Sequence, residues 1–307
     1  MQGKNEHRDR DQIGKKLAIA LISAHKLQLL LAGEISGAML SPLVVDARPE
    51  NEYEAGHIPT AVRIGWEDWN AKPVLKALGL SLDLWEPGYW GALDNGRLEE
   101  FAGRLAKLGL SNHRPVVVYA DSLASKGREG RIAWMLLYMG LQNVSLLDGG
   151  WRAWLDAGGA FDRLESRVER GSFSLQLDSR RRVSTGTLAR VCGRGKMPTS
   201  VDTRSLSEFQ GDSFDYQPRK GHLPKAVQLS YESLFEDSGA YAGREKFLSL
   251  LDPRVLSDPN LITYCEVGVR ASTYALLLEA YTGRVLPVYD ASIMEWGADK
   301  ALPLLKE

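Results

Sequence analysis

A cysteine and an arginine at the start of a helical pattern have the types and spacing best suited to chemistry. Cys265 opens the segment Cys265-Glu-Val-Gly-Val-Arg270, between the apolar runs 261–264 and 271–280. The first run is typical of a buried strand and the second of a helix, so the cysteine lies on the loop between them. The free N–H groups and positive end of a helix point into such a loop and stabilise a thiolate, the reactive form of cysteine. Because Arg270 adds a full charge, the sequence predicts a nucleophile and an anion pocket at one place.

An inert cysteine that merely ends a strand is the alternative, because free cysteines are usually buried and unreactive. Two neighbours favour the reactive interpretation. Gly268 lets the backbone curl so that amide groups converge, and an arginine directly before an apolar helix has no evident packing role. The predicted cradle for a bound anion consists of Glu266, Val267, Gly268, Val269 and Arg270.

Composition limits the classes of protein to which the chain can belong. It has 307 residues, of which 44% are hydrophobic, enough for two domains with sizeable cores. A formal net charge of −1 does not favour nucleic acid or an anionic membrane as a partner. Two cysteines, Cys192 and Cys265, exclude a disulfide framework and a four-cysteine metal site, and the five histidines show no metal-binding spacing. We therefore expect no metal and no other cofactor.

The N-terminal part of the chain contains no clear membrane span or secretory signal. Residues 1–12 are almost wholly polar, and the apolar segment 13–35 is interrupted by charged and polar residues. We expect a flexible start followed by an amphipathic helix. The prediction is a cytoplasmic protein without a membrane span, and a periplasmic location stays open.

The chain contains two copies of one unit. A capped helix, a Val-Asp-x-Arg element, a Gly-His-x-Pro element, an apolar run ending in tyrosine, and an Asp with a Trp at equal separation occur in both halves. The matching residues are Ser23 and Ser184, Arg48 and Arg204, His57 and His222, Tyr119 and Tyr264, Asp148 and Asp290, and Trp154 and Trp296. Short apolar runs alternate with helical patterns in each copy, which predicts an α/β fold with mostly parallel sheets flanked by helices.

The repeat divides the chain into a flexible segment (1–21), a first domain (22–160), a linker (161–183) and a second domain (184–307). The linker is rich in charge and contains one candidate strand, 172–177. The first copy has Ala120 or Asp121 where the second has Cys265, so only the second domain can use a cysteine nucleophile. We expect the first domain to pack against it and to form one wall of a cleft.

Taken together, these elements resemble the rhodanese domain. The resemblance is carried by the tandem Val-Asp-x-Arg and Gly-His-Ile/Leu-Pro elements, segment 148–154 and the Cys265 loop, and covers roughly residues 22–305. Two such domains with a cysteine only in the second are similar to thiosulfate and 3-mercaptopyruvate sulfurtransferases. The resemblance implies that Cys265 takes sulfur from a small anionic donor as a persulfide and passes it to cyanide, a thiol or a protein thiol. Loop amides and Arg270 would stabilise the developing negative charge.

Two further functions are alternatives to sulfur transfer by an enzyme, and the length and charge of the Cys265 loop bear on them. Related cysteine phosphatases and arsenate reductases carry one more residue between cysteine and arginine, so the six residues from Cys265 to Arg270 favour sulfur transfer. Thiosulfate-type loops are usually basic after the cysteine, whereas this chain has Glu266, which should oppose a dianion. A non-catalytic sulfur carrier or sensor is therefore the third possibility, and a protein persulfide is a further candidate donor.

Three basic residues of the second domain are candidates for binding the donor. Arg204 matches an arginine that the resemblance places near the active loop, but Arg48 occupies the same position in the first copy, which favours a structural pair with the preceding aspartate. Arg219 and Lys220 precede the second Gly-His element, where they could line the mouth of the cleft or form a solvated loop.

His57 and His222 invite a role as catalytic bases. Both copies carry the histidine, including the copy without a nucleophile, so we expect both to form turns. Tryptophans are mostly expected in the core, and one or two of a first-domain group are expected to wall the cleft opposite Cys265. This group is Trp66, Trp69, Trp85 and Trp90.

Overall fold

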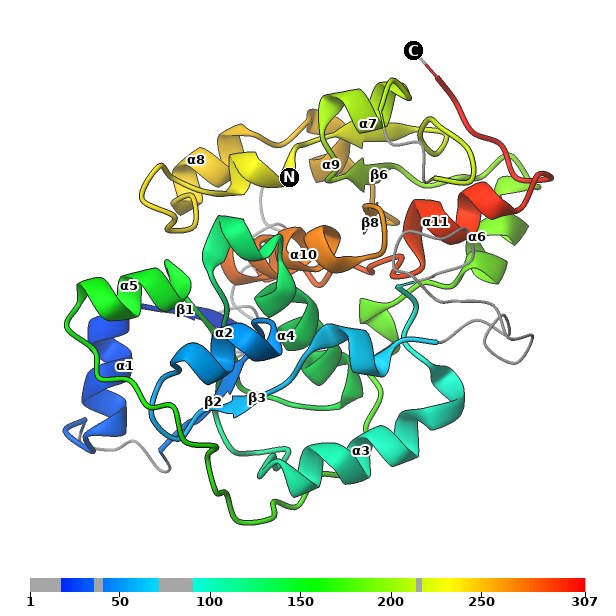
Figure 1. The fold of residues 1–307 in the computed structure, drawn as a ribbon. Helices are drawn as coiled ribbons and strands as arrows, with labels where there is room; N and C mark the ends of the chain where they lie inside the picture. The colour runs from blue at the N-terminus through cyan, green and yellow to red at the C-terminus, as the bar shows by residue number, and fades with distance from the viewer. Residues whose placement is uncertain (1–17, 36–40, 72–90, 214–216, 307) are drawn as a thin grey trace, which may run out of the picture.

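A computed structural model describes residues 18–35, 41–71, 91–213 and 217–306. Expectations for residues 1–17 and for Trp85 and Trp90 lie outside these ranges. Each repeat forms an α/β unit, and the two units lie against each other, with the first half of the chain in the lower part of Figure 1 and most of the second half above it.

The first domain is built on a five-stranded parallel sheet with strand order β1-β5-β4-β2-β3. The strands are β1 (Ile19–Ile22), β2 (Leu43–Asp46), β3 (Val62–Arg63), β4 (Val116–Tyr119) and β5 (Val144–Leu147). The helices are α1 (Ala24–Leu31), α2 (Glu50–Ala55), α3 (Leu98–Lys107), α4 (Arg128–Met139) and α5 (Gly150–Asp156). The buried strands β2 and β4 each begin with three branched aliphatic residues and end in Asp46 and Tyr119, as expected for a sheet covered on both faces.

The second domain repeats this order in a smaller sheet. Strands β6 (Ser200–Asp202), β7 (Ala226–Gln228) and β8 (Ile262–Tyr264) pair in parallel in the order β7-β6-β8. Single parallel bridges from Thr263 to Val288 and from Val288 to Arg182 stand where β5 and β1 stand in the first sheet. The helices are α6 (Thr185–Cys192), α7 (Leu206–Gln210), α8 (Arg244–Ser249), α9 (Pro253–Ser257), α10 (Val269–Thr282) and α11 (Ser292–Ala298).

Two expectations about the segments before the capped helices are wrong. Residues 19–22 form β1 rather than part of a helix over 13–35, because they pair with β5, and α1 begins only after Ser23. No strand forms at 172–177, because backbone groups of Ser174 and Gln176 bond instead to Asn112 and to the carbonyl of Met139.

The domains meet along α4 and α10, which lie side by side at the centre of the molecule (Figure 1). Both helices are buried along almost their whole length. Gly130 permits the close approach, because a Cβ there would lie 2.1 Å from Thr273 Oγ1 and 2.7 Å from Thr273 Cα. Helices that are apolar on most sides must be kept out of water by other elements. Because α4 and α10 cover each other, the two domains form one unit.

Candidate active site

Cys265 lies at the carboxyl end of β8, on the loop that leads into α10. The expected position between a strand and a helix is confirmed. Gly268 adopts a φ of 79°, which turns the chain so that its N–H donates a hydrogen bond to Cys265 Sγ at 3.2 Å. A Cβ at Gly268 would lie 2.6 Å from the carbonyl oxygen of Asp290. Glycine is therefore needed here both for the turn and for the space.

Ser292 holds the start of this loop by a hydrogen bond, and the cysteine motif did not identify it. It is fully buried at a φ of 56°, an unusual conformation for a residue other than glycine. Its Oγ accepts the N–H of Cys265 at 3.1 Å and donates to the carbonyl of Tyr289 at 2.7 Å. The repeat contains the signal, because the matching residue of the first copy is Gly150, which has a φ of 58°. The second copy thus keeps a side chain in a backbone conformation that favours glycine.

Arg270 is held by Glu208, a residue that the sequence motifs did not single out. The guanidinium donates to both carboxylate oxygens of Glu208, at 2.7 and 2.8 Å, and lies 3.5 Å from Glu266. Glu208 is buried and forms a capping box with Ser205 at the start of α7. Burial opposes its ionisation, but the hydrogen bonds and charge of Arg270 outweigh burial and lower the pKa of the Glu208 carboxyl. Much of the positive charge expected at the anion pocket is therefore neutralised.

A cavity of about 760 Å³ includes Cys265 in its lining and lies between the domains. The first domain contributes Pro49, Glu52, Trp66, Asp121, Ala124, Ser125, Lys126 and Arg128. The second contributes Ser205, Glu208, Glu232, Cys265, Glu266, Val267, Val269 and Arg270. The expectations that the first domain forms one wall and that a tryptophan lies in it are confirmed. The loop that replaces the cysteine loop in the first copy faces the cysteine loop of the second.

The lining of this cavity is more acidic than basic. It holds five carboxylates and three cationic groups. Arg270 is paired with Glu208, and Arg128 lies 2.6 Å from Glu67. Among the described residues, one cation of the lining, Lys126, has no ion pair. Three carboxylates of the lining also have none: Glu52, Asp121 and Glu232. The electrostatic environment therefore disfavours a dianion more than a neutral or singly charged ligand.

The three candidate donor-binding residues lie elsewhere. Arg204 is fully buried and donates to Asp202 at 2.9 and 2.6 Å and to the carbonyl of Gly221 at 2.9 Å. Arg219 donates to carbonyls near the end of α11, which leaves it structural. Among the residues that the structure describes, neither these two nor Lys220 lines the cavity. The guanidinium of Arg204 is used by the aspartate and the turn, as in the structural pair that the matching Arg48 favours.

The histidines of the repeat have the expected structural role. The ring of His57 stacks on Tyr53 and that of His222 on Phe209, with 3.8 Å between ring centroids in both pairs. Each Nδ1 lies 2.9 Å from the carbonyl oxygen of the residue on which the ring stacks. Identical geometry in a copy without a nucleophile identifies both rings as parts of a turn.

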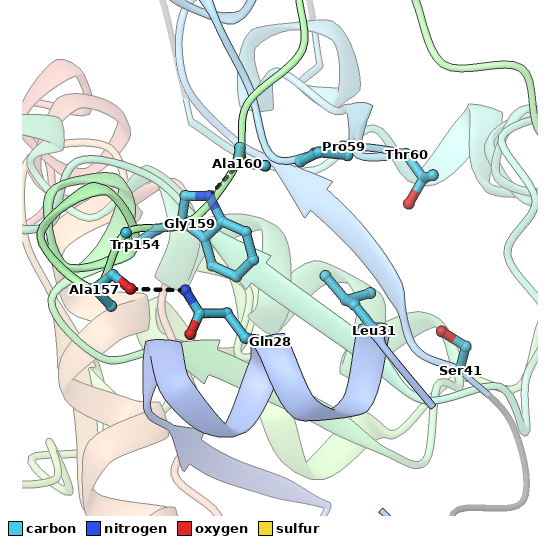
Figure 2. Close-up of a pocket in the computed structure, with 10 residues that line it drawn as sticks. Gln28, Leu31, Ser41, Pro59, Thr60, Trp154, Ala157, Gly159 and Ala160 are labelled. Atoms are coloured by element: carbon cyan, nitrogen blue, oxygen red, sulfur yellow. Dashed lines mark hydrogen bonds between the residues drawn. The ribbon is translucent and has the colours of Figure 1, made fainter. Parts of the chain in front are cut away.

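A second cavity, of about 570 Å³, lies beside α1 in the first domain (Figure 2). Two of its polar side chains are used within the protein: Trp154 Nε1 donates to the carbonyl of Ala160 at 2.7 Å, and Gln28 Nε2 to that of Ala157 at 3.0 Å. Its lining contains no charged side chain and no thiol. This cavity is therefore not a candidate for covalent chemistry.

Within the part of the chain that the structure describes, no group of three or more His, Cys, Asp or Glu side chains is arranged to hold a metal ion. Over the same residues, no helix combines the length and the apolar character needed to traverse a lipid bilayer.

Comparison with protein families matches the rhodanese-like domain twice, to residues 29–157 and 186–299. The chain belongs to the rhodanese family. It is 29% identical over 293 residues to a probable 3-mercaptopyruvate sulfurtransferase of Pseudomonas aeruginosa, a match that covers 90% of this chain and 97% of the relative. It is 26% identical over 269 residues to the sulfur carrier protein TtuD of Thermus thermophilus, with 83% and 87% covered. The thiosulfate sulfurtransferase of Gallus gallus is 29% identical over 197 residues, with 64% and 68% covered.

Solved structures share this tandem rhodanese fold. An anaerobic ergothioneine biosynthesis enzyme from Chlorobium limicola aligns with a TM-score of 0.76 at 20% identity, covering 93% of this chain and 70% of that one. YnjE aligns with a TM-score of 0.75 at 23% identity, covering 93% and 68%. The two-domain rhodanese fold predicted from the repeat is thus confirmed, and the names of the relatives indicate a sulfurtransferase of this family.

Proposed function

We propose that this rhodanese-family protein is a sulfurtransferase that carries sulfur on Cys265 as a persulfide. One observation carries the proposal. The cysteine ends a buried strand, receives the N–H of Gly268 on its sulfur and lies in the wall of a cavity large enough for a small donor. The loop N–H and the start of α10 both favour negative charge on this sulfur.

The reaction has two displacement steps. In the first, the Cys265 thiolate attacks the outer sulfur of the donor, a sulfur–sulfur bond forms, and the bond to the rest of the donor breaks. The electron pair leaves with sulfite from thiosulfate, or with the pyruvate enolate, which then takes a proton, from 3-mercaptopyruvate. In the second, the thiolate of an acceptor attacks the terminal sulfur and Cys265 leaves as a thiolate. The N–H of Gly268 stabilises the sulfur anion that departs in this step.

The charges of the cavity favour an organic donor over thiosulfate. Glu266 follows the nucleophile directly, and Glu52, Asp121 and Glu232 have no ion pair among the described residues. Two like charges 4 Å apart repel by about 1 kcal/mol in water and by about 4 kcal/mol near a protein surface. This repulsion is twice as large for a dianion such as thiosulfate as for a monoanion at the same distance. In our proposal 3-mercaptopyruvate or a persulfide is therefore the preferred donor.

Mass spectrometry of the intact protein tests this function. After incubation with 3-mercaptopyruvate, we expect one added sulfur atom that maps to Cys265, and a smaller yield with thiosulfate at equal concentration. Cys265→Ser should take up none, whereas the control Cys192→Ser should behave as the unmodified protein. Added sulfur that maps to Cys192 contradicts the proposal. So does the absence of added sulfur after incubation with 3-mercaptopyruvate, with thiosulfate and with a protein persulfide.

A sulfur carrier that exchanges sulfur only with partner proteins is the second candidate. The acidic lining favours it, as does the similarity to a relative named sulfur carrier protein. In that case Cys265 accepts sulfur from a protein persulfide in a stoichiometric reaction, and steady-state turnover with small donors is absent. Turnover with 3-mercaptopyruvate and a small thiol therefore distinguishes the enzyme from the carrier.

A further inference from the structure

The first domain touches the Cys265 loop directly at Gly91. A Cβ on Gly91 would lie 1.7 Å from the carbonyl oxygen of Val267, 2.5 Å from its carbonyl carbon and 2.7 Å from its Cβ. Real Cβ atoms do not approach other atoms so closely, and two of these three atoms belong to the backbone. The contact with the Val267 backbone therefore demands a residue without a side chain at position 91.

The contacted carbonyl belongs to the peptide group that serves the nucleophile. Val267 supplies the C=O and Gly268 the N–H of one planar unit, and that N–H donates to Cys265 Sγ at 3.2 Å. Any push on the carbonyl oxygen therefore turns or shifts the N–H as well. The far side of the loop cannot yield freely, because Gly268 lies against Asp290 and the N–H of Cys265 is bonded to Ser292.

Gly91 is itself held firmly in place. Its carbonyl accepts a hydrogen bond from Arg131 Nη2 on α4, and the same nitrogen donates to Asn70 Oδ1 at 3.0 Å. Two residues on, the N–H of Leu93 donates to Asp290 at 2.7 Å. Arg131 is 2% exposed, so these bonds lie in the interior. The segment that carries Gly91 thus has a fixed position relative to both the first domain and the loop.

We propose that Gly91 is a positioning residue for sulfur transfer, through which the first domain sets the orientation of the Val267–Gly268 peptide at the nucleophile. The inference rests on the proposed function for its effect on rate. It assigns the first domain an active part in the reaction: the domain without a nucleophile orients the hydrogen-bond donor of the domain that has one. Removal of one preorganised donor typically costs roughly 10²–10³ in rate, and a misdirected donor costs less.

The test compares Gly91→Ala with Gly103→Ala, both in a Cys192→Ser background so that Cys265 is the single thiol. Gly103 lies on α3 in the same domain, and a Cβ there would meet no atom within 4 Å. We expect Gly91→Ala to slow single-turnover sulfur uptake by about 10- to 100-fold. It should also slow iodoacetamide labelling of Cys265 at pH 7, because the sulfur loses its N–H donor. Gly103→Ala should leave both measurements unchanged.

Arg131→Lys provides a second variant in case Gly91→Ala does not fold. It weakens the hold on the Gly91 carbonyl without adding an atom at the contact, and we expect the same two changes at a smaller size, about 2- to 10-fold in rate. Unchanged sulfur uptake and labelling in folded Gly91→Ala, or in Arg131→Lys if only that variant folds, overturns the inference. If the unmodified protein takes up no sulfur, the proposed function fails, while the labelling rate still reports on Gly91.

Discussion

The carboxylate of Asp290 in the second domain accepts the backbone N–H of Leu93 in the first domain at 2.7 Å. The repeat counterpart, Asp148, accepts the N–H of Tyr241 in the second domain at 2.8 Å. In each domain the matching aspartate therefore accepts a backbone N–H of the other domain. The two aspartates differ in charge partners, because Asp290 also accepts hydrogen bonds from Arg182 at 3.0 Å and lies 3.9 Å from Arg131. The interface is thus symmetric in its hydrogen bonds and asymmetric in its charge.

This asymmetry predicts different costs for two matched substitutions. Asp290→Asn deprives the nearly buried Arg182 of its counter-charge, and we expect unfolding free energy to fall by about 2–3 kcal/mol. Asp148→Asn should cost under about 1 kcal/mol, because an amide oxygen can still accept the Tyr241 N–H, and burial already raises the pKa of Asp148 and so disfavours its ion. Urea denaturation at pH 7 measures both. Equal losses in the two variants would show that Arg182 does not depend on Asp290.

The buried pairs Asp46–Arg48 and Asp202–Arg204 predict equal effects of truncation in the two domains. Both guanidiniums are bound to the aspartate two residues earlier and to a turn carbonyl. We expect Arg48→Ala and Arg204→Ala each to lower the unfolding free energy by about 3–5 kcal/mol, since each leaves a buried carboxylate unpaired. The KM for the sulfur donor, measured on the folded fraction, should not differ between the variants. A KM raised only in Arg204→Ala would restore the donor-binding role.

Glu208 predicts an acid-sensitive contribution to stability. Its pKa is lowered by Arg270, so the pair stabilises the fold above the unfolded pKa of about 4.3, and this stabilisation is lost as pH falls through the folded value. Glu208→Gln should therefore lower the unfolding free energy by about 3 kcal/mol at pH 7, and the difference should shrink below about pH 4. Glu245→Gln, at an exposed position on α8, serves as the control. A loss that stays constant with pH would contradict the assigned pairing.

Glu129 predicts the opposite pH dependence. One of its carboxylate oxygens accepts the Tyr241 hydroxyl at 3.0 Å, and the other has no hydrogen-bond partner among the described residues. Burial, with a smaller contribution from Asp121, raises the pKa of Glu129 to about 7, against the effects of Tyr241 and Arg128. The folded state then binds the proton more firmly than the unfolded state, so stability falls as pH rises from about 4.3 to about 7.

Glu129→Gln should remove this pH dependence. The amide stays neutral at every pH, so the variant should match the unmodified protein at pH 4 and exceed its unfolding free energy at pH 8 by up to about 3 kcal/mol. Urea denaturation at the two pH values measures the difference. Parallel stability curves for the two proteins would mean that Glu129 is ionised throughout.

Local sequence patterns predict those elements whose stabilising contacts are close along the chain. The capped helices after Ser23 and Ser184, strand β8 and helix α10 all follow from nearby residues and are confirmed. The errors concern segments whose partners are distant. Residues 19–22 become a strand only because β5, which begins at Val144, supplies the hydrogen bonds. The same limit explains the segment 172–177, whose backbone groups find partners in the first domain.

The position of Cys265 on a loop between a strand and a helix is predictable from sequence, whereas the residues that hold the loop are visible in the sequence only through the repeat, if at all. Cys265 is marked by its neighbours, but Glu208 meets Arg270 only after folding brings two distant segments together. The repeat contains a signal for Glu208, since Glu52 precedes Tyr53 as Glu208 precedes Phe209. Gly91 carries no such signal, because a sequence does not show what a missing side chain would meet.

The absence of space between Gly130 and Thr273 has a consequence for any shortened form of this chain. A gene shortened to its second repeat would encode a polypeptide with α10 uncovered, although every atom of the reactive loop would still be encoded. The second repeat alone therefore lacks the surface that covers α10, and the two halves of the chain depend on each other for a complete core.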